Sequence, residues 1–375
     1  MMASFTQYPY TRPPPQPAHV DTTRRLGAVA ILGRRSVPEL QELVALRSKG
    51  WDDDHLDYYF KTLQKISDSP TKQAKQAWFK NMRNIMAELD SAANFVRSST
   101  NVKFLDVGCA PGGFSSYILQ KVRSASGVGI SLPEGMGGHP FLLQNHLRSR
   151  YTHLQEDILG YDWSPVSPSG VSDRPRRRLR DTLIGHFPIV ILDGHALRTY
   201  QDPSITTLDA EADLLKAAHG SYRDRLLIAQ LIIALESVAP GGTIVTRLSH
   251  IECFPAAQLL YLLDSISDEV VLHKPQTMHT TRGTSYVIAK RVFCSKQASK
   301  REQYLLGLQA LWSQLQQGGP QEGVGRMLVD GDLDFIMSAE AILENYVDRL
   351  VELGRQTWWT QAESLRRLFN KKGIQ

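Results

Sequence analysis

The stretch that decides the fold is FLDVGCAPGGFSSYIL, Phe104 to Leu119. Its first half is an apolar run with an acid before the glycines, which is typical of a buried strand, and its second half has the apolar spacing of a helix. Glycines between the two halves let the backbone approach a ligand and turn the start of the helix toward it. A strand, a glycine turn and a helix in this order predict a ligand site at the carboxyl edge of a parallel sheet.

The spacing of the glycines narrows the choice of ligand. Gly108, Gly112 and Gly113 do not match Gly-x-Gly-x-x-Gly, the spacing of a dinucleotide-binding turn. Pro111 also removes an N–H group from the turn, which weakens a pyrophosphate cradle. S-adenosylmethionine has no phosphate, and its amino and carboxylate groups suit the carboxylate of Asp106 and the backbone of the turn. These features suit S-adenosylmethionine as a ligand of the turn, and a simple strand–turn–helix joint without a ligand is the alternative.

Strands alternate with helices after Thr100. A long helical run, YRDRLLIAQLIIALESVAPGG, is expected to end at Pro240 and the two glycines behind it. Such alternation predicts an α/β fold with a mostly parallel sheet of seven strands and helices on both faces. The seven β-rich runs are VKFLDVG, ASGVGIS, YTHLQEDI, FPIVILDG, GGTIVTRLS, EVVLHKPQ and TSYVIAKR.

Composition divides the chain into four segments. Residues 1–36 are rich in proline and polar residues and are expected to be a disordered tail. Residues 37–75 read as helical, and residues 76–294 form the α/β domain. Within that domain, residues 163–186 have the Ser/Pro/Gly/Arg content of a basic surface insertion rather than of core. Residues 295–375 are expected to form a C-terminal helical extension.

Composition also limits the compartment and the partners. The 375 residues carry a formal net charge of +5, and no apolar run approaches the roughly 20 residues of a membrane helix, so no membrane partner is expected. Three cysteines without metal-ligand spacing indicate a reduced intracellular compartment and no metal site. Cytoplasm or nucleus is expected, and the arginines before Val37 leave the mitochondrion open.

One short segment concentrates positive charge. RPRRRLR, Arg174 to Arg180, holds five arginines in seven residues. Clustered arginines suit the phosphate backbone of a nucleic acid, whereas a solvated loop is the simpler interpretation.

Two further acids end strands where an adenosine group would lie. Asp157 closes the third β-rich run and is a candidate for accepting a hydrogen bond from an adenine amino group. Asp193 closes the fourth run and is expected to face the transferable methyl group. A helix cap or a loop turn is the structural alternative for each.

Taken together, these stretches resemble the FtsJ-like (RrmJ-like) family of S-adenosylmethionine-dependent ribose 2′-O-methyltransferases. The resemblance covers roughly residues 76–291, and it implies a Rossmann-like class I methyltransferase fold with RNA as the acceptor. It is carried by LDVGCAPGGFSSYIL, by AWFK at Ala77 to Lys80, and by IVILDG, LIIALESVAPGGTIVTRL and HKPQTMHTTRGTSYVIA.

The family uses a Lys-Asp-Lys-Glu tetrad, in which a lysine deprotonates or orients the ribose hydroxyl. The resemblance assigns the first lysine to Lys80 and the aspartate to Asp193. It places Arg247 where the second lysine belongs and Thr284 where the glutamate belongs. Arginine stays protonated in proteins and cannot be a general base, although its planar fork can bind a phosphate or a carboxylate. Threonine can form hydrogen bonds but cannot offset a charge.

The resemblance also implies the cofactor site. Ser131 stands where many nucleoside-binding folds carry an acid for the ribose hydroxyls, and Glu134 is the acid that follows. Three other groups follow strands that end at the same edge and are alternative acceptor-side residues: Lys274, His250 and His195. The candidate cofactor-binding residues are Asp106, Gly108, Cys109, Pro111, Gly112, Gly113, Phe114, Ser131, Asp157 and Asp193.

Three functions remain open from the sequence. The first is an RNA 2′-O-methyltransferase with a variant tetrad, which should show a continuous basic surface leading to the cleft. The second is a methyltransferase of the same fold for a small-molecule acceptor, with a cleft closed by the C-terminal helices and their tryptophans Trp312, Trp358 and Trp359. The third is a non-catalytic relative that binds RNA or a protein partner. Packing inside a helical bundle is the simpler role for the tryptophans.

Overall fold

The computed structural model describes most of the chain. The described residues are 27–51, 53, 56, 58–59, 62, 68–97, 102–165, 177–197, 212–294, 297–319 and 324–374. The expected tail up to residue 26 and the first half of the arginine-rich segment lie outside these ranges.

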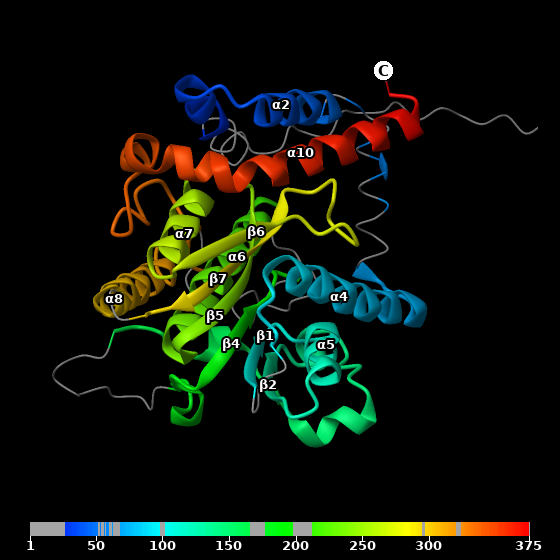
Figure 1. Ribbon diagram of the computed structural model, residues 1–375, viewed down its shortest axis with the longest axis vertical. Coiled ribbons are helices and arrows are strands. Elements are labelled where there is room, and N and C mark those ends of the chain that lie inside the picture. The colour runs from blue at the N-terminus through cyan, green and yellow to red at the C-terminus, as the bar shows by residue number, and fades with distance from the viewer. Residues whose placement is uncertain are drawn as a thin grey trace, which may run out of the picture.

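The core of the molecule is a seven-stranded sheet with the strand order β3-β2-β1-β4-β5-β7-β6 (Figure 1). All neighbouring strands are parallel except β7, which runs antiparallel to both β5 and β6. This confirms the α/β fold and all seven strands expected from the sequence. The strands are β1 Lys103–Val107, β2 Ser126–Ser131, β3 Tyr151–Gln155, β4 Phe187–Leu192, β5 Val238–Ser249, β6 Glu269–His273 and β7 Thr284–Val292.

The two faces of the sheet belong to two apolar cores. Central strands such as β4 are apolar on both sides because each face is covered, as expected for parallel strands. In β4, Val190 and Leu192 pack into one core, while Ile189 and Ile191 pack into the other. The helices α6 Ala212–Ser237, α7 Phe254–Ser265 and α8 Ala298–Leu315 contribute to the first core, and α4 Lys72–Ala93 and α5 Gly113–Lys121 contribute to the second.

Helices from both ends of the chain form a further layer. The helix α2 Pro38–Trp51 lies beside α10 Val347–Lys372 (Figure 1). The short helix α9 Ala339–Ala341 and a π-helical turn, Ile342–Tyr346, precede α10. Among the described residues, none of the helices has the length and apolarity needed to cross a bilayer.

The structure corrects three boundaries. Residues 27–34 are helical, and Ala28 and Ile31 are buried, so the expected disordered tail does not reach residue 36. Helix α6 ends at Ser237, and Pro240 with its glycines lies inside β5 instead of ending the helix. The expectation that residues 163–186 are only a surface insertion is wrong at both ends, because Trp163 and Leu183 are buried in the first core.

Two of the three C-terminal tryptophans pack as the simpler interpretation expects. Trp312 and Trp358 are fully buried, whereas Trp359 is 47% exposed.

Helix α4 crosses the start of α5 at Gly113, and this contact leaves no space for a side chain. A Cβ atom at Gly113 would lie 2.5 Å from the carbonyl oxygen of Phe79 and 2.6 Å from Cβ of Met82. The close contact places the segment that carries Lys80 against the glycine turn.

Gly113→Ala should therefore lower the free energy of unfolding by about 1–3 kcal/mol, because the two helix backbones must separate. Urea unfolding followed by circular dichroism measures this loss. Gly160→Ala is the control, since no heavy atom lies within 4 Å of its added Cβ. Equal stability of the two variants would contradict the packing described for α4.

Candidate functional site

The glycine turn brings the ends of three strands together. Gly108 has a left-handed backbone (φ 82°), and a Cβ atom there would collide with the backbone of Gly194, just after β4. The Gly108 N–H donates to the carbonyl oxygen of Ile130 at the end of β2 (2.8 Å), and the Asp193 N–H donates to that of Val107 (3.0 Å). The turn thus lies where the strand order reverses between β1 and β4, the usual ligand position in such folds.

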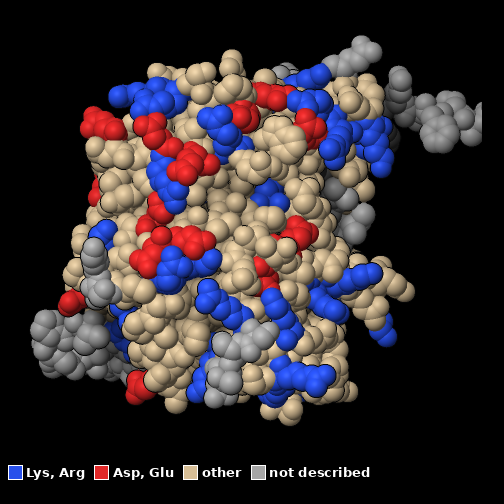
Figure 2. Space-filling model, in the orientation of Figure 1, with Lys and Arg blue, Asp and Glu red and all other residues tan. Residues whose placement is uncertain are grey.

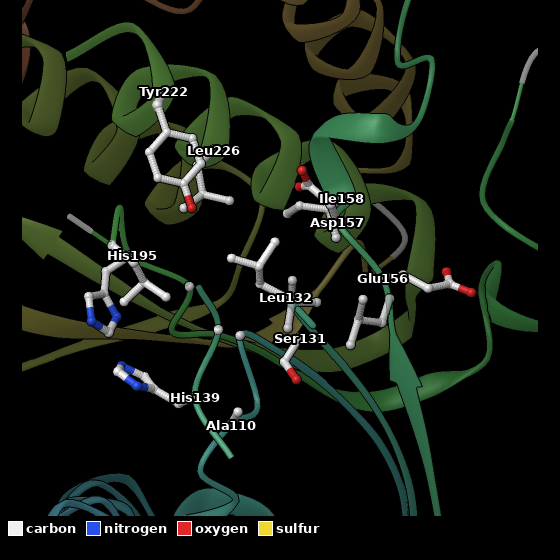
Figure 3. Close-up of a pocket in the computed structure, with 16 residues that line it drawn as sticks. Ala110, Ser131, Leu132, His139, Glu156, Asp157, Ile158, His195, Tyr222 and Leu226 are labelled. Carbon is white, nitrogen blue, oxygen red and sulfur yellow. The ribbon is translucent and has the colours of Figure 1, made fainter. Parts of the chain in front are cut away.

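An open cavity lies at this edge of the sheet (Figure 3). In the part of the chain that the structure describes, its lining contains carboxylates, hydroxyls and imidazoles but no lysine or arginine, which favours a ligand without phosphate groups. The lining residues are Val107, Gly108, Ala110, Ile130, Ser131, Leu132, Gly138, His139, Glu156, Asp157, Ile158, Gly194, His195, Leu197, Tyr222 and Leu226.

Three of the predicted cofactor residues, Gly108, Ser131 and Asp157, line the cavity. The other predicted residues are not part of its lining, although they surround the turn. Asp106, Cys109 and Phe114 are fully buried behind it, and Gly112 adopts a left-handed backbone with φ 104°. Pro111 accepts the N–H of Leu142 on its carbonyl oxygen (2.8 Å), and Gly113 provides the α4 contact.

Asp106 is a buried carboxylate with one unsatisfied oxygen. Its Oδ2 accepts a hydrogen bond from Ser115 Oγ (2.5 Å), but no described residue donates to Oδ1. Burial raises the pKa of Asp106 to about 7; the Ser115 hydrogen bond opposes this rise and the charge of Asp193 adds to it. An orphaned acceptor beside the glycine turn fits a ligand with an amino group, as S-adenosylmethionine has.

Ser131 is held in place by the next strand. Its hydroxyl lies 2.8 Å from Nε2 of His153, and the His153 ring stacks on Phe141 with the ring centres 4.1 Å apart. A fixed hydroxyl at this position can form a hydrogen bond with a ribose. Glu134 is exposed on a 3-10 turn and does not line the cavity, so it does not take over this position.

Asp157 is both a helix cap and a residue of the cavity lining. Its Oδ1 accepts the N–H of Leu159 (2.9 Å) and caps a short 3-10 helix, while the residue also lines the cavity. Its neighbour Glu156 lines the cavity as well and was missed by the sequence analysis, although both acids stand in the motif LQEDI. Asp157 and Glu156 lie toward one end of the cavity, and His139 and His195 lie at the other (Figure 3).

Glu156 also binds the end of the arginine-rich segment. Its carboxylate is 3.0 Å from Arg177 Nη2 and 2.6 Å from Arg180 Nη2, and it accepts the hydroxyl of Tyr161. The Arg177 guanidinium in turn lies 4.6 Å from the centre of the Tyr161 ring. These two arginines are therefore already paired within the protein, which reduces their availability for a phosphate backbone.

Asp193, just after β4, is held by one side chain of β5 and one of β7. Tyr286 donates its hydroxyl to Asp193 Oδ1 (2.8 Å), and Arg247 Nε lies 3.5 Å from the same oxygen. Arg247 also donates to the Asp193 carbonyl oxygen (3.3 Å). Burial raises the pKa of Asp193, while Arg247 and Tyr286 oppose the rise. The arrangement keeps a carboxylate next to a permanent cation at the edge of the cavity.

Tyr286 is the second residue that the sequence analysis missed. It lies directly opposite Arg247 in the antiparallel pair of β5 and β7, so both side chains are on one face of the sheet. Tyr286 belongs to the core that α4 and α5 cover. It stands two residues after Thr284, and the two-residue period of a strand was the signal that could have identified it.

The other two tetrad candidates are not joined to Asp193. Thr284 begins β7, and its carbonyl oxygen accepts Lys274 Nζ (2.7 Å). Lys80 is exposed on α4, and no described residue forms a hydrogen bond or an ion pair with it. The structure thus brings Asp193 and Arg247 together and leaves Lys80 and Thr284 apart from them.

Helix α4 nevertheless reaches the cavity. Trp78, two residues before Lys80, makes an edge contact with His139, with the ring centres 5.3 Å apart. His139 and His195 approach each other at 6.3 Å. Burial, and then the charge of Arg247, hold the pKa of His195 well below its ordinary value, so this imidazole is neutral near pH 7. Of the alternative acceptor-side residues, His195 alone lines the cavity.

A Rossmann-like sheet with a cavity at the point where its strand order reverses is an arrangement that binds nucleotide-like ligands. Residues 76–292 match the family model of FtsJ-like methyltransferases, which is more than half of the chain. The chain therefore belongs to the FtsJ-like methyltransferase family, which confirms the family expected from the sequence. FtsJ-like methyltransferases use S-adenosylmethionine, the cofactor that suits the glycine turn.

Similar proteins are RNA methyltransferases by name. Over 287 residues the chain is 23% identical to an inactive cap-specific mRNA (nucleoside-2′-O-)-methyltransferase 1B of Caenorhabditis briggsae, with 75% of this chain and 31% of that protein covered. It is 29% identical to ribosomal RNA large subunit methyltransferase E of Brachyspira hyodysenteriae, with 37% and 81% covered. It is 25% identical to cap-specific mRNA (nucleoside-2′-O-)-methyltransferase 1 of Danio rerio, with 65% and 28% covered. The chain thus spans about a third or less of these cap-specific relatives.

The buried carboxyl of Asp106 leads to a pH-dependent stability. Its pKa is about 7 in the folded protein and about 4 in an unfolded chain, so this group stabilises the fold fully below pH 4, and that stability is lost as the pH rises through 7. Asp106→Asn removes the titration. Between pH 5 and 8 the parent should therefore lose roughly 1–3 kcal/mol more unfolding free energy than Asp106→Asn does.

Urea unfolding at the two pH values, without cofactor, measures this difference. Asp181→Asn, at an exposed position, is the control and should follow the parent. A parent and an Asp106→Asn variant with the same pH dependence would contradict a proton held on Asp106.

Proposed function

We propose that the protein is an S-adenosylmethionine-dependent methyltransferase that acts on the ribose 2′-hydroxyl of RNA. The observation that carries the proposal is the placement of Asp193, held by Arg247 and Tyr286 beside the cavity, in a chain of the FtsJ-like family. The names of the relatives supply the acceptor class, because they act on mRNA caps or on ribosomal RNA.

The residues of the cavity suit the cofactor at its different parts. The backbone around Gly108 and the orphaned oxygen of Asp106 would hold the amino-acid end, and the hydroxyl of Ser131 the ribose. Asp157 would accept a hydrogen bond from the adenine. The bound cofactor supplies the methyl group, and the protein positions the acceptor oxygen in line with it, which accounts for much of the acceleration in such a transfer.

On the acceptor side, Arg247 and Lys80 have different tasks. Arg247 cannot release its proton, so it fixes the carboxylate of Asp193 and adds positive charge at the site. Lys80 is exposed on α4, the helix that covers the sheet face of Tyr286 and Arg247, so its amino group is available to contact the acceptor. We assign to Lys80 the orientation of the acceptor hydroxyl.

A basic surface leads toward this site. Lysine and arginine side chains gather over α4 and α5 in Figure 2, while both signs of charge mix over α2 and α10. Exposed Lys72, Lys80 and Arg83 follow one face of α4 at helical spacing. We therefore place the phosphate contacts of RNA along α4 rather than on Arg177 and Arg180, which Glu156 already binds. An RNA acceptor also places the protein inside the cell, in the cytoplasm, the nucleus or the mitochondrion.

Radiolabelled S-adenosylmethionine and total cellular RNA test the proposal. The parent should transfer label that is recovered as 2′-O-methylnucleoside after digestion. Asp193→Ala should abolish the transfer, because Arg247 and Tyr286 lose their common partner. Lys80→Met should lower it by about 10²–10⁴-fold if the lysine orients or deprotonates the hydroxyl. Lys371→Met, in the last turn of α10, is the matched lysine control and should behave like the parent.

Two other outcomes would each overturn the proposal. Cofactor binding without label in RNA would point to a small-molecule acceptor. Absence of cofactor binding by calorimetry would indicate a non-catalytic relative. One similar protein, that of Caenorhabditis briggsae, is named as inactive.

A further inference from the structure

A buried carboxylate outside the cavity joins the helices of both chain ends to the sheet. Glu252 follows β5 by three residues and is 2% exposed. Its Oε1 lies 2.5 Å from Arg47 Nη1 of α2 and 3.2 Å from His250 Nδ1. Its Oε2 accepts the indole N–H of Trp358 from α10 (3.1 Å). One side chain thus links two helices to the turn after β5.

The same cluster continues into the hairpin between β6 and β7. Gln361 of α10 accepts a hydrogen bond from Arg47 (3.1 Å) and donates to the carbonyl oxygen of Thr281 (3.2 Å). Lys274 is buried and donates to the carbonyl oxygens of Arg282 and Thr284. Residues 274–283 form the acceptor hairpin, named for Thr284, the tetrad candidate that directly follows them.

The turn after β5 and the acceptor hairpin are also bound to each other. The His250 N–H donates to the carbonyl oxygen of Gly283 (2.9 Å), and a Cβ atom at Gly283 would meet the imidazole of His250. Ser249 pairs with Thr284, and Arg247 pairs with Tyr286, in the adjoining strands. Any movement of this turn or of the acceptor hairpin therefore reaches the strand ends that hold Asp193.

On its other side the acceptor hairpin is fixed to the helix that carries Lys80. Glu88 of α4 accepts the N–H groups of Gln276 (2.6 Å) and Thr277 (2.9 Å). The acceptor hairpin consequently connects α4 with the Glu252 cluster. The cavity itself has no lining residue from α2, α10 or the acceptor hairpin among the residues that the structure describes.

The charges around Glu252 are better suited to fixing the position of nearby loops than to adding stability. Burial by itself would raise the pKa of Glu252, but Arg47 and His250 outweigh it and hold this pKa well below its usual range. A buried charged cluster stabilises a fold no better than apolar residues of similar volume, because desolvation of the charges offsets their attraction. Its hydrogen bonds are directional, however, and they fix two loops that apolar packing would leave less defined.

We propose that Glu252 is a positioning residue for the acceptor. Glu252 sets the affinity for RNA because it fixes the turn after β5 and the acceptor hairpin against α2 and α10. This inference rests on the proposed function for the identity of the acceptor. Glu252 does not touch the cofactor cavity, so cofactor binding is independent of it.

Glu252→Gln tests the inference against a matched variant. Asp264→Asn is the control, because Asp264 of α7 also binds the C-terminal helices, through Arg349 of α10 (3.2 Å) and Tyr346 of the π-helical turn (3.0 Å). No hydrogen bond joins it to the described residues of the turn after β5 or of the acceptor hairpin. Glu252→Gln should raise the KM for RNA at least about 10-fold with the cofactor Kd changed less than about 3-fold. Hydrogen exchange of residues 274–284 should become faster in Glu252→Gln and stay unchanged in Asp264→Asn.

A double variant separates positioning from stability. Arg47→Met combined with Glu252→Gln removes both charges, so it should recover most of the melting temperature lost in Glu252→Gln while the KM stays high. Equal effects of Glu252→Gln and Asp264→Asn on the KM, or a parallel loss of cofactor affinity, would overturn the inference. Unchanged hydrogen exchange of the acceptor hairpin in Glu252→Gln would also overturn the inference, and this measurement does not require enzymatic activity. Absence of transfer to RNA by the parent would instead overturn the proposed function alone.

Discussion

The site depends on the contact between the backbones of Gly108 and Gly194. No side chain fits between the turn after β1 and the segment after β4, so the two strand ends meet directly at the point where the strand order reverses. This contact puts the cavity and the carboxylate of Asp193 at the same edge of the sheet. A larger residue at Gly108 would need both a left-handed backbone and space that Gly194 occupies.

Arg247 stands where the family resemblance implies a lysine, and an arginine there limits what its side chain can do with a proton. A buried lysine can lose its charge and take part in proton transfer, whereas Arg247 is a permanent cation. Burial raises the pKa of Asp193, and the nearby guanidinium opposes part of this rise. Tyr286 completes this arrangement with a hydroxyl that only donates to the carboxylate. Under the proposed function, Arg247 would supply positive charge and not a base, and the proton of the acceptor hydroxyl would leave to another group or to water.

The sequence predicted the sheet and the cavity edge because both follow from local patterns. Apolar strands that alternate with helices, and a glycine turn after the first of them, need no distant partner to be recognised. Tyr286 and Glu252 escaped prediction because their importance comes from partners far along the chain. Tyr286 is 93 residues from Asp193, and Glu252 is 205 residues from Arg47. The helix at residues 27–34 was missed for the same reason, since its apolar face is recognisable only once its packing partner is known.

The first apolar core also bears on where the protein can be divided. Residues from near the N-terminus such as Leu43, from the central strand β1 such as Val107, and from α10 such as Leu350 all belong to that one core. The segment that matches the family, residues 76–292, contains only part of it. The segment of this chain that matches the family is therefore not a complete packing unit. The flanking helices are part of the protein's interior, so residues 76–292 placed in another chain would expose apolar surface that these helices cover.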